Sequence, residues 1–159
     1  MKTKLVILAL LLFSTATFTQ NAAAQQAASA EDEAAIKRVI EGETTAIYAR
    51  DFKTAFNHWA NVSYISRVST DQEGKVTKLM GDELRKIGEQ YAAQNLAPSK
   101  EIATRENWLI RANGNAAFVV FDQHNQYPDG KTRDSVEERY MERIDNEWKI
   151  VNVTNLPRK

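Results

Sequence analysis

The segment from Ala116 to Thr154 constrains the fold of this chain more than any other. It contains three long runs rich in β-branched and aromatic residues, separated by Pro128-Asp129-Gly130 and by Asp145-Asn146. Such runs between turn-forming residues predict β-strands. A further run, Glu101 to Ala112, comes before them and ends at Asn113-Gly114. The sequence therefore predicts an antiparallel meander of long strands, with the upstream residues covering one of its faces.

The turns predict which residues share a face of this sheet. Two-residue hairpin loops and one longer loop give three cross-strand pairs: Ala112 opposite Asn115, Ile144 opposite Glu147, and Tyr127 opposite Arg133. Because side chains alternate along a strand, these pairs sort the residues into two faces. The face expected to be concave and helix-covered carries Glu106, Trp108, Ile110, Val119, Phe121, Gln123, Glu137, Arg139, Met141, Trp148, Ile150 and Asn152. The outer face is expected to carry Leu109, Phe118, Val120, Asp122, His124, Glu138, Tyr140, Glu142, Lys149, Val151 and Val153.

The first 24 residues have the composition of a secretory signal peptide. Lys2 and Lys4 precede an apolar run from Leu5 to Phe13, and three alanines end at Ala24. Such a basic start, short apolar run and small-residue site are typical of cleaved export signals. The run is too short to span a bilayer, which needs about 20 apolar residues. We therefore expect an exported protein, periplasmic or secreted, with a disordered leader at 25–30 and a single domain at 31–159.

Charge and composition narrow the partners. Without residues 1–24 the chain has 19 basic and 21 acidic residues, a formal charge of −2. A chain with no basic excess is not expected to bind nucleic acid or an anionic membrane surface. The sequence contains no cysteine, so disulfides and thiol chemistry are excluded. No cofactor is expected, and phosphate-binding glycine loops are absent. A Ser-His-Asp hydrolase is not supported, because no serine lies in a nucleophile-elbow sequence.

Helical periodicity precedes the meander. Ser29 and Asp32 form a capping-box pattern, followed by apolar residues at helical spacing over about 31–49. Gly42 interrupts this helix and would allow close packing. Asp51 is expected to cap a second helix, and Asp82 a third. A short strand is expected over 62–68 between the second and third helices.

The order of elements and several short segments resemble the nuclear transport factor 2-like superfamily. The segments are Ala49-Arg50-Asp51-Phe52, Asn113-Gly114-Asn115-Ala116-Ala117 and Glu142 to Ile150, with support from Glu106-Asn107-Trp108 and Phe121-Asp122-Gln123. The resemblance covers residues about 31–155. It implies an α+β fold in which three N-terminal helices pack in the concavity of a strongly curved mixed or antiparallel sheet, a cone-shaped barrel. It also implies a pocket between sheet and helices and, often, a homodimer formed through the outer sheet face.

The resemblance does not extend to the ketosteroid isomerase reaction. Enzymes of that type use an aspartate base on the first strand and a tyrosine–aspartic acid oxyanion pair. Here residues 62–68 contain no carboxylate, and the first helix has Gly42-Glu43 where a tyrosine would be expected. Function therefore has to be argued from the pocket residues themselves.

The predicted concave face brings charged residues among aromatic ones. Glu106, Glu137 and Arg139 would lie among Trp108, Phe121 and Trp148, with Gln123 and Asn152 nearby. Two carboxylates beside one guanidinium could leave one carboxylate with a raised pKa, suited to act as a general base. The alternative is an ion-pair network that closes the cone without any ligand. The expected pocket lining is Tyr48, Trp59, Tyr64, Glu106, Trp108, Phe121, Gln123, Glu137, Arg139, Trp148 and Asn152.

The two histidines have competing interpretations. His58 lies beside the apolar stripe of the second helix, either as a hydrogen-bonded core residue or as a proton donor in the pocket. Asp122, His124 and Glu138 have the residue types of metal ligands. Their predicted position on the outer face favours a solvated or dimer-facing patch, so no metal is expected.

Three hypotheses for function follow. The favoured one is an exported domain that binds a small, partly apolar molecule between aromatic walls and the charged cluster. The second is a lyase or isomerase with Glu137 or Glu106 as base and Arg139 stabilising an oxyanion; His58 is a further catalytic candidate. The third is a dimeric interaction module with a filled cone.

Overall fold

The structure is a computed structural model that describes residues 27–71, 73–94 and 96–158. The expected signal peptide, residues 1–24, lies outside the described residues. Of the expected leader, the described part begins at Ala27, which forms an isolated β-bridge with Arg111. Ser29 then caps the first helix, because its side chain accepts a hydrogen bond from the backbone N–H of Asp32.

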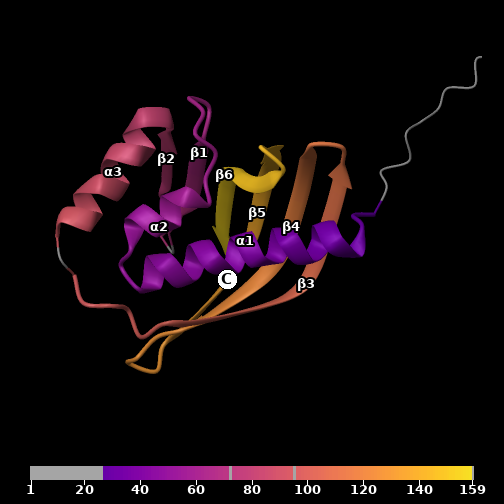
Figure 1. The fold of residues 1–159 in the computed structure, drawn as a ribbon. Helices are drawn as coiled ribbons and strands as arrows, with labels where there is room; N and C mark the ends of the chain where they lie inside the picture. The colour runs from indigo at the N-terminus through magenta and orange to yellow at the C-terminus, as the bar shows by residue number, and fades with distance from the viewer. Residues whose placement is uncertain (1–26, 72, 95, 159) are drawn as a thin grey trace, which may run out of the picture.

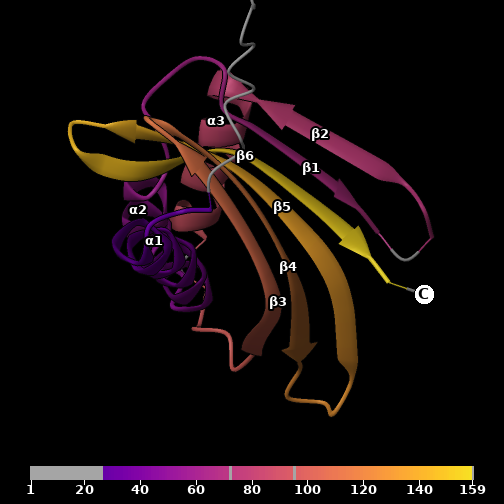
Figure 2. The same ribbon diagram turned by 90° about the vertical axis from the view of Figure 1, so that its right-hand side faces the viewer.

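Six strands form one mixed sheet. In chain order they are β1 (Ser66–Thr70), β2 (Val76–Met80), β3 (Ile102–Asn113), β4 (Ala116–Gln126), β5 (Thr132–Ile144) and β6 (Glu147–Pro157). Their spatial order is β2-β1-β6-β5-β4-β3, and only the β1–β6 pairing is parallel among these strands. The long strands β3 to β6 bend together and make one face of the sheet strongly concave (Figure 2). The sheet does not close on itself.

Three helices complete the fold: α1 (Ala30–Tyr48), α2 (Phe52–Asn57) and α3 (Gly81–Ala93). Helix α1 runs across the concave side of the long strands, and α3 lies beside β1 and β2 (Figure 1). Asp51 caps α2 as expected, accepting a hydrogen bond from Thr54 N–H. The expected cap at Asp82 is wrong: Met80 holds the cap position without a side-chain bond, and Asp82 lies in the first turn.

The α+β fold expected from the sequence is confirmed. The short strand expected over 62–68 begins only at Ser66, and β2 pairs with it through a hairpin around Gly74. Among the described residues, no helix combines the length and apolar character needed to cross a membrane.

The cross-strand pairs predicted at the turns are close enough to the observed ones that the residues near the turns lie on their predicted faces of the sheet. Ile144 pairs with Glu147 as predicted, across a loop in which Asp145 and Asn146 both have positive φ. Ala112 pairs with Ala117 instead of Asn115, and the backbone N–H of Tyr127 bonds Lys131 instead of pairing with Arg133. Both errors are shifts of two residues. Since the side-chain period of a strand is two, every residue near these turns keeps its predicted face.

Two β-bulges overturn part of the face assignment. Between Glu106 and Leu109 the β3–β4 register shifts, and Asn107 has φ +54°. Glu106 therefore pairs with Asp122 on the outer face, and Arg105 takes the inner position opposite Gln123. In β6 the register shifts opposite Tyr140 and Met141. This second bulge moves Asn152 out of the predicted inner set and buries Val151 and Val153, which were predicted to lie outside.

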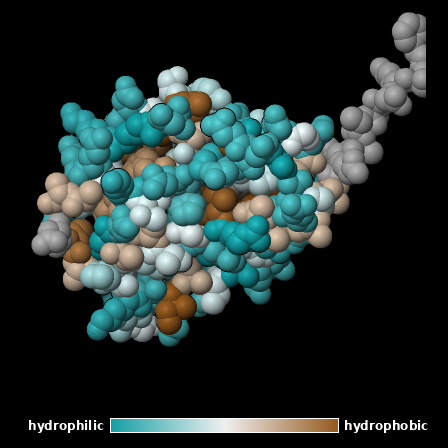
Figure 3. Space-filling view, viewed as in Figure 1, coloured by the Kyte–Doolittle hydropathy of each residue, from teal (hydrophilic) through white to brown (hydrophobic). Residues whose placement is uncertain are grey.

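The core lies between α1 and the concave face. Ile36 and Ile40 of α1 are fully buried against inward residues of the sheet such as Val119, Phe121 and Ile150. Trp108, Phe121 and Trp148 share this helix-covered side, as predicted. The surface seen from the helix side is mostly hydrophilic, with small separate hydrophobic spots (Figure 3).

Candidate functional site: a polar cavity in the cone

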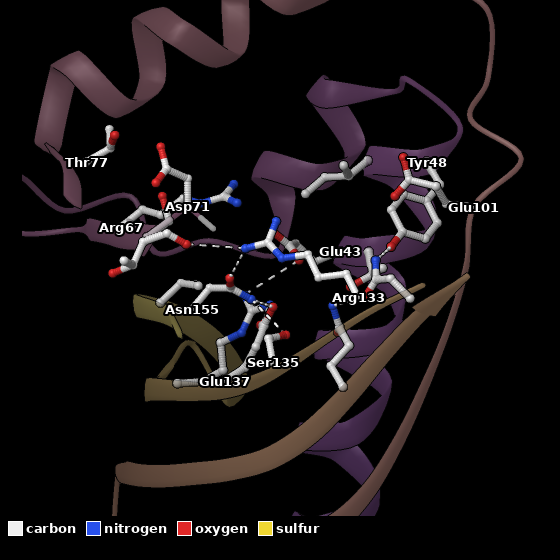
Figure 4. A pocket seen from close by; sticks show the side chains of 18 of the residues that line it. Glu43, Tyr48, Arg67, Asp71, Thr77, Glu101, Arg133, Ser135, Glu137 and Asn155 are labelled. Atoms are coloured by element: carbon white, nitrogen blue, oxygen red, sulfur yellow. Dashed lines mark hydrogen bonds and ion pairs between the residues drawn. The ribbon is translucent and has the colours of Figure 1, made fainter. Parts of the chain in front are cut away.

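A cavity of about 290 Å³ lies between α1, the β1–β2 hairpin and the concave face of the sheet. Side chains from these elements converge on it, with Glu43 and Tyr48 coming from α1 and Ser135, Glu137 and Asn155 from the sheet (Figure 4). Its lining residues are Glu43, Thr44, Ile47, Tyr48, Trp59, Arg67, Ser69, Thr70, Asp71, Thr77, Glu101, Gln123, Asn125, Tyr127, Arg133, Ser135, Glu137, Arg139, Val153 and Asn155. Polar side chains dominate this set.

A buried ion-pair cluster forms the inner end of the cavity. Arg139 Nη2 lies 2.5 Å from Glu137 Oε2, and Arg139 Nη1 lies 3.6 Å from Glu43 Oε2. Glu43 comes from α1, where it occupies one position of the apolar stripe, and its Oε1 accepts a hydrogen bond from Trp59 Nε1. The cluster therefore joins helix α1 to strand β5.

Glu137 is held as a carboxylate. Burial alone would raise the pKa of Glu137, but Arg139, a hydrogen bond from Asn155 and the charge of Arg67 together leave that pKa below its usual value. Burial would lower the pKa of Arg139, and the carboxylates of Glu137 and Glu43 raise it above the ordinary value instead. Both groups of the pair are therefore ionised in the folded protein.

A polar chain leads from this cluster toward Arg133. Asn155 Nδ2 donates to Glu137 Oε1 over 2.8 Å and to Ser135 Oγ over 3.1 Å. Arg133 Nη2 in turn donates to Asn155 Oδ1 over 2.9 Å, and to the carbonyl of Thr70 over 3.4 Å. The buried Glu137 carboxylate thus has both oxygens occupied by donors.

A second polar chain lines the opposite wall. Gln123 Nε2 donates to Asn125 Oδ1 over 2.9 Å, and Asn125 Nδ2 donates to the Tyr48 hydroxyl over 2.6 Å. Burial and the nearby charge of Glu101 raise the pKa of Tyr48 to about 12. Tyr48 is therefore a neutral hydroxyl at physiological pH.

Several buried polar atoms of this region have no hydrogen-bond partner among the described residues. They are Arg139 Nε and Nη1, Arg133 Nε, Arg105 Nε and Gln123 Oε1. A buried donor without an acceptor costs about 1–3 kcal/mol. Native proteins rarely tolerate a group of such atoms unless water, an ion or a ligand completes them.

The cavity lining carries four carboxylates, on Glu43, Asp71, Glu101 and Glu137, and three guanidinium groups, on Arg67, Arg133 and Arg139, which gives a formal charge of −1. Two buried carboxylates, Glu43 and Glu137, are surrounded by four guanidinium groups: Arg139 pairs with both, and Arg67, Arg105 and Arg133 lie nearby. Two of the four lining carboxylates accept hydrogen bonds from neutral groups of the chain, Asp71 from Lys75 N–H and Glu101 from the Ser99 hydroxyl.

The structure brings together some of the residues that the sequence placed in a pocket. Tyr48, Trp59, Gln123, Glu137 and Arg139 line the cavity. The expected aromatic walls do not: Trp108 and Phe121 pack on each other with 4.4 Å between ring centroids, and Phe121 is fully buried in the core. Trp148 donates from Nε1 to Asp32 and borders a separate hollow.

Three more expected pocket residues lie elsewhere. Tyr64 is exposed and donates to Glu142 over 2.8 Å. Glu106 is on the outer face because of the β3 bulge, which removes it as a candidate base. Asn152 donates to Ser66 Oγ, on the other side of the sheet from the cavity.

The histidines are also outside the cavity. His58 caps the C-terminus of α2, borders the hollow that contains Trp148, and packs beside Gly42. His124 Nδ1 lies 2.5 Å from Asp134, while Asp122 accepts from Asn107 and Arg158. No three His, Asp or Glu side chains of the described chain are grouped as metal ligands.

Sequence reasoning missed Glu43, Asn125, Arg133 and Asn155. A signal existed for Glu43, because it follows the spacing of the buried Ile36 and Ile40, and a glutamate at such a position needs a partner. Asn125 and Arg133 continue the inward alternation of Gln123 and Glu137, but the loop between them hid that continuity.

The fold is that of the nuclear transport factor 2-like superfamily, as the sequence indicated. A nuclear transport factor 2-like protein of unknown function from Pseudomonas putida superposes with a TM-score of 0.63, at 15% identity over 80% of this chain and 87% of that one. A proposed dehydratase of the same family from Streptomyces avermitilis gives 0.62, at 15% identity over 80% and 97%. The association domain of CaMKII from C. elegans gives 0.60, at 22% identity over 79% and 95%.

These likenesses establish the fold alone. No protein-family profile matches this sequence. No curated protein sequence matches it either.

Proposed function

We propose that this protein binds a small anionic molecule in the polar cavity of its cone. The observation that carries the proposal is the set of buried guanidinium nitrogens on Arg139 and Arg133 that have no hydrogen-bond acceptor among the described residues. Guanidinium groups form strong charge-assisted hydrogen bonds with carboxylates and phosphates. An anionic group placed among them would satisfy these donors.

The size and lining of the cavity define the ligand further. A volume of about 290 Å³ is at the lower end of ordinary ligand pockets. The polar lining replaces the aromatic walls expected from the sequence. Both features favour a small polar metabolite over the partly apolar ligand of the sequence-based hypothesis.

The proposal includes export. The basic, apolar and small-residue pattern of residues 1–24 supports a cleaved signal, which would place the cavity in the periplasm or outside the cell. Intact-mass measurement of the protein recovered from the periplasm tests this, since cleavage removes the first 24 residues or nearly so.

Titration calorimetry with pentanoate, inorganic phosphate and sulfate tests anion binding. At least one of these anions should bind, and Arg133→Met should weaken that binding about tenfold or more, the loss expected for a buried charge-assisted hydrogen bond. Arg38→Met is the matched control, because Arg38 is an exposed residue of α1 outside the cavity lining. Absence of binding by any anion, or equal loss in both variants, would contradict the proposal.

One observation favours a lyase as a second candidate. Glu43 is buried, and apart from the 3.6 Å approach of Arg139 its Oε2 has no hydrogen-bond donor among the described side chains. Such a carboxylate could remove a proton from carbon while Arg139 stabilises the developing oxyanion. Glu137 is less suited to this role because donors occupy both of its oxygens. If the protein is a lyase, Glu43→Gln abolishes turnover and retains anion binding.

We also propose a homodimer formed through the outer sheet face. Leu109, Phe118 and Tyr140 are each 40–44% exposed there, and Val120 lies among them. Apolar side chains gathered on one face of a sheet are common at subunit contacts. That an association domain shares the fold is consistent with assembly.

A further inference from the structure

We infer that the ligand of the cavity carries an ammonium group besides its anionic group, and that Glu101 binds this ammonium beside the rings of Tyr48 and Tyr127. The ligand is then a small amino acid. This inference rests on the proposed function, and it names the class of ligand. It is carried by a carboxylate of the cavity wall that has no cation partner among the described residues and lies beside aromatic side chains of the same wall.

Glu101 presents a fixed carboxylate to the cavity. Its Oε1 accepts a hydrogen bond from Ser99 Oγ over 3.0 Å, and its backbone N–H donates to the same Oγ over 3.2 Å. The backbone N–H of Ser99 donates to the Tyr48 carbonyl over 2.7 Å, which ties this segment to the end of α1. Among the described residues, no donor bonds to Glu101 Oε2, and no lysine or arginine forms an ion pair with Glu101.

A molecule in the cavity can reach Glu101 and both tyrosines. All three side chains line the cavity, and each is only partly buried. Tyr48 and Glu101 lie on the same side of it (Figure 4). The three groups are close enough that, after burial, the charges of Glu101 and Tyr127 contribute to the raised pKa of Tyr48.

An ammonium is the group that suits this side of the cavity. It supplies the positive charge that Glu101 lacks as a partner, and all three of its N–H groups donate. The faces of tyrosine rings also attract a cation that lies within about 6 Å. A second anionic group placed here would be repelled by Glu101, and a neutral hydroxyl would leave the charge of Glu101 without a counter-charge.

The charges of the lining favour a zwitterion over a simple anion. The formal charge of the lining is −1, so a bound monoanion would bring the occupied cavity to −2, whereas an amino acid adds no net charge. The two sides of the cavity are joined through Asn125, which donates to the Tyr48 hydroxyl and pairs with Arg133 in the β4–β5 register. One small molecule can therefore place its carboxylate at the arginines and its ammonium at Glu101.

A panel of matched acids tests the inference by titration calorimetry on the full protein at neutral pH. Pentanoate is compared with its four positional amino isomers and with the four corresponding hydroxy acids, which are similar in size but lack the positive charge. At least one amino isomer should bind about fivefold more tightly than both pentanoate and its hydroxy counterpart. This is the gain expected from one ion pair at a half-buried carboxylate together with a cation–π contact.

Variants at two glutamates identify the group that binds the ammonium. In Glu101→Gln the preference for the amino isomer over its hydroxy counterpart should fall to about one, while the amide can still accept the hydrogen bond from Ser99. Glu41→Gln should keep the preference, because Glu41 is exposed on α1 and outside the cavity lining. Tyr127→Leu should reduce the preference in part, because it removes one ring and leaves the carboxylate.

The outcomes separate this inference from the proposed function. If none of these acids binds, and neither phosphate nor sulfate does, both are wrong. If one of these anions binds but no amino isomer binds more tightly than its hydroxy counterpart, only the ammonium inference is overturned. A preference that survives in Glu101→Gln, or that is lost in Asp71→Asn instead, also overturns it, because the ammonium would then lie at another acceptor.

Discussion

Glu137 and Arg139 stand two residues apart on β5, and their buried side chains form an ion pair of 2.5 Å. Their spacing places both on the concave face, because side chains alternate along a strand. The third member of the cluster, Glu43, arrives from α1 across the cone. The cluster of these three residues therefore links α1 to the sheet and forms the inner wall of the cavity.

Removal of Arg139 should destabilise the protein severely. Arg139→Leu leaves two buried carboxylates without their cation, and breaking a buried pair typically costs about 3–5 kcal/mol. The free energy of unfolding from urea denaturation measures this loss. A loss under about 1 kcal/mol would show that the cluster is more hydrated than its burial indicates.

A triple variant separates structure from binding. The variant combines Glu43→Met, Glu137→Met and Arg139→Leu, which removes all three charges and keeps side chains of similar size. It should recover most of the stability lost in Arg139→Leu. The same variant should lose the rise in melting temperature that a bound anion gives the native protein. Full retention of that rise would remove these three residues from the binding site.

The sequence predicted the faces of the sheet correctly wherever the error in strand register was an even number of residues. Shifts of two residues at two turns left Ile110, Val119 and Gln123 on the predicted side. The bulges had the opposite effect, because one extra residue reverses the alternation beyond it. Asn107 tolerates its positive φ better than most residues would, but nothing in the local pattern marks it as a bulge.

The composition of the cavity was harder to predict than its location. The sequence placed Glu137, Arg139 and Gln123 on one face. The assignment to a face does not tell which of its residues are buried in the core and which line a cavity. In the structure the aromatic residues of that face fill the space under α1, and the polar ones line the open end. Which end stays open depends on how α1 and the β1–β2 hairpin cover the sheet, a tertiary property that strand patterns do not contain.

Gly42 should be required because His58 packs against it. A β-carbon at Gly42 would lie 2.7 Å from His58 Cε1 and 2.9 Å from its Nε2. Alanine in a helix is normally favoured over glycine by about 1 kcal/mol. Overpacking should outweigh this gain, so we expect Gly42→Ala to destabilise by about 1–2 kcal/mol in denaturant unfolding.

A double-mutant cycle tests the contact. In a His58→Ala background the clash is absent, and Gly42→Ala should then be neutral or stabilising. Equal destabilisation by Gly42→Ala in both backgrounds would assign the effect to the helix backbone instead.

His58 should also make stability depend on pH. Burial lowers the pKa of His58 below its usual 6.5, and nearby Lys149 adds to this, while Glu43 partly opposes it. The unfolded chain therefore takes up the proton at a higher pH than the folded protein. Stability from this group is present above about pH 6.5 and decreases as the pH falls below it.

Urea unfolding between neutral and mildly acidic pH should show this decrease in stability, and the decrease should be smaller in His58→Gln. An unchanged slope in the variant would assign the pH dependence to other groups.

The outer face of the sheet should govern self-association. Phe118 and Tyr140 pair across β4 and β5, and both are exposed. If this face forms the homodimer, sedimentation at micromolar concentration should show a dimer, and Phe118→Asp should shift it to monomer by placing a charge in an apolar contact. Leu96→Asp is the control, because Leu96 is similarly exposed but lies in the connection after α3.

The anion affinity of the Phe118 variant should remain that of the native protein, since the cavity opens on the opposite face of the sheet. A native protein that sediments only as monomer, or a dimer that survives Phe118→Asp, would remove this face as the subunit contact.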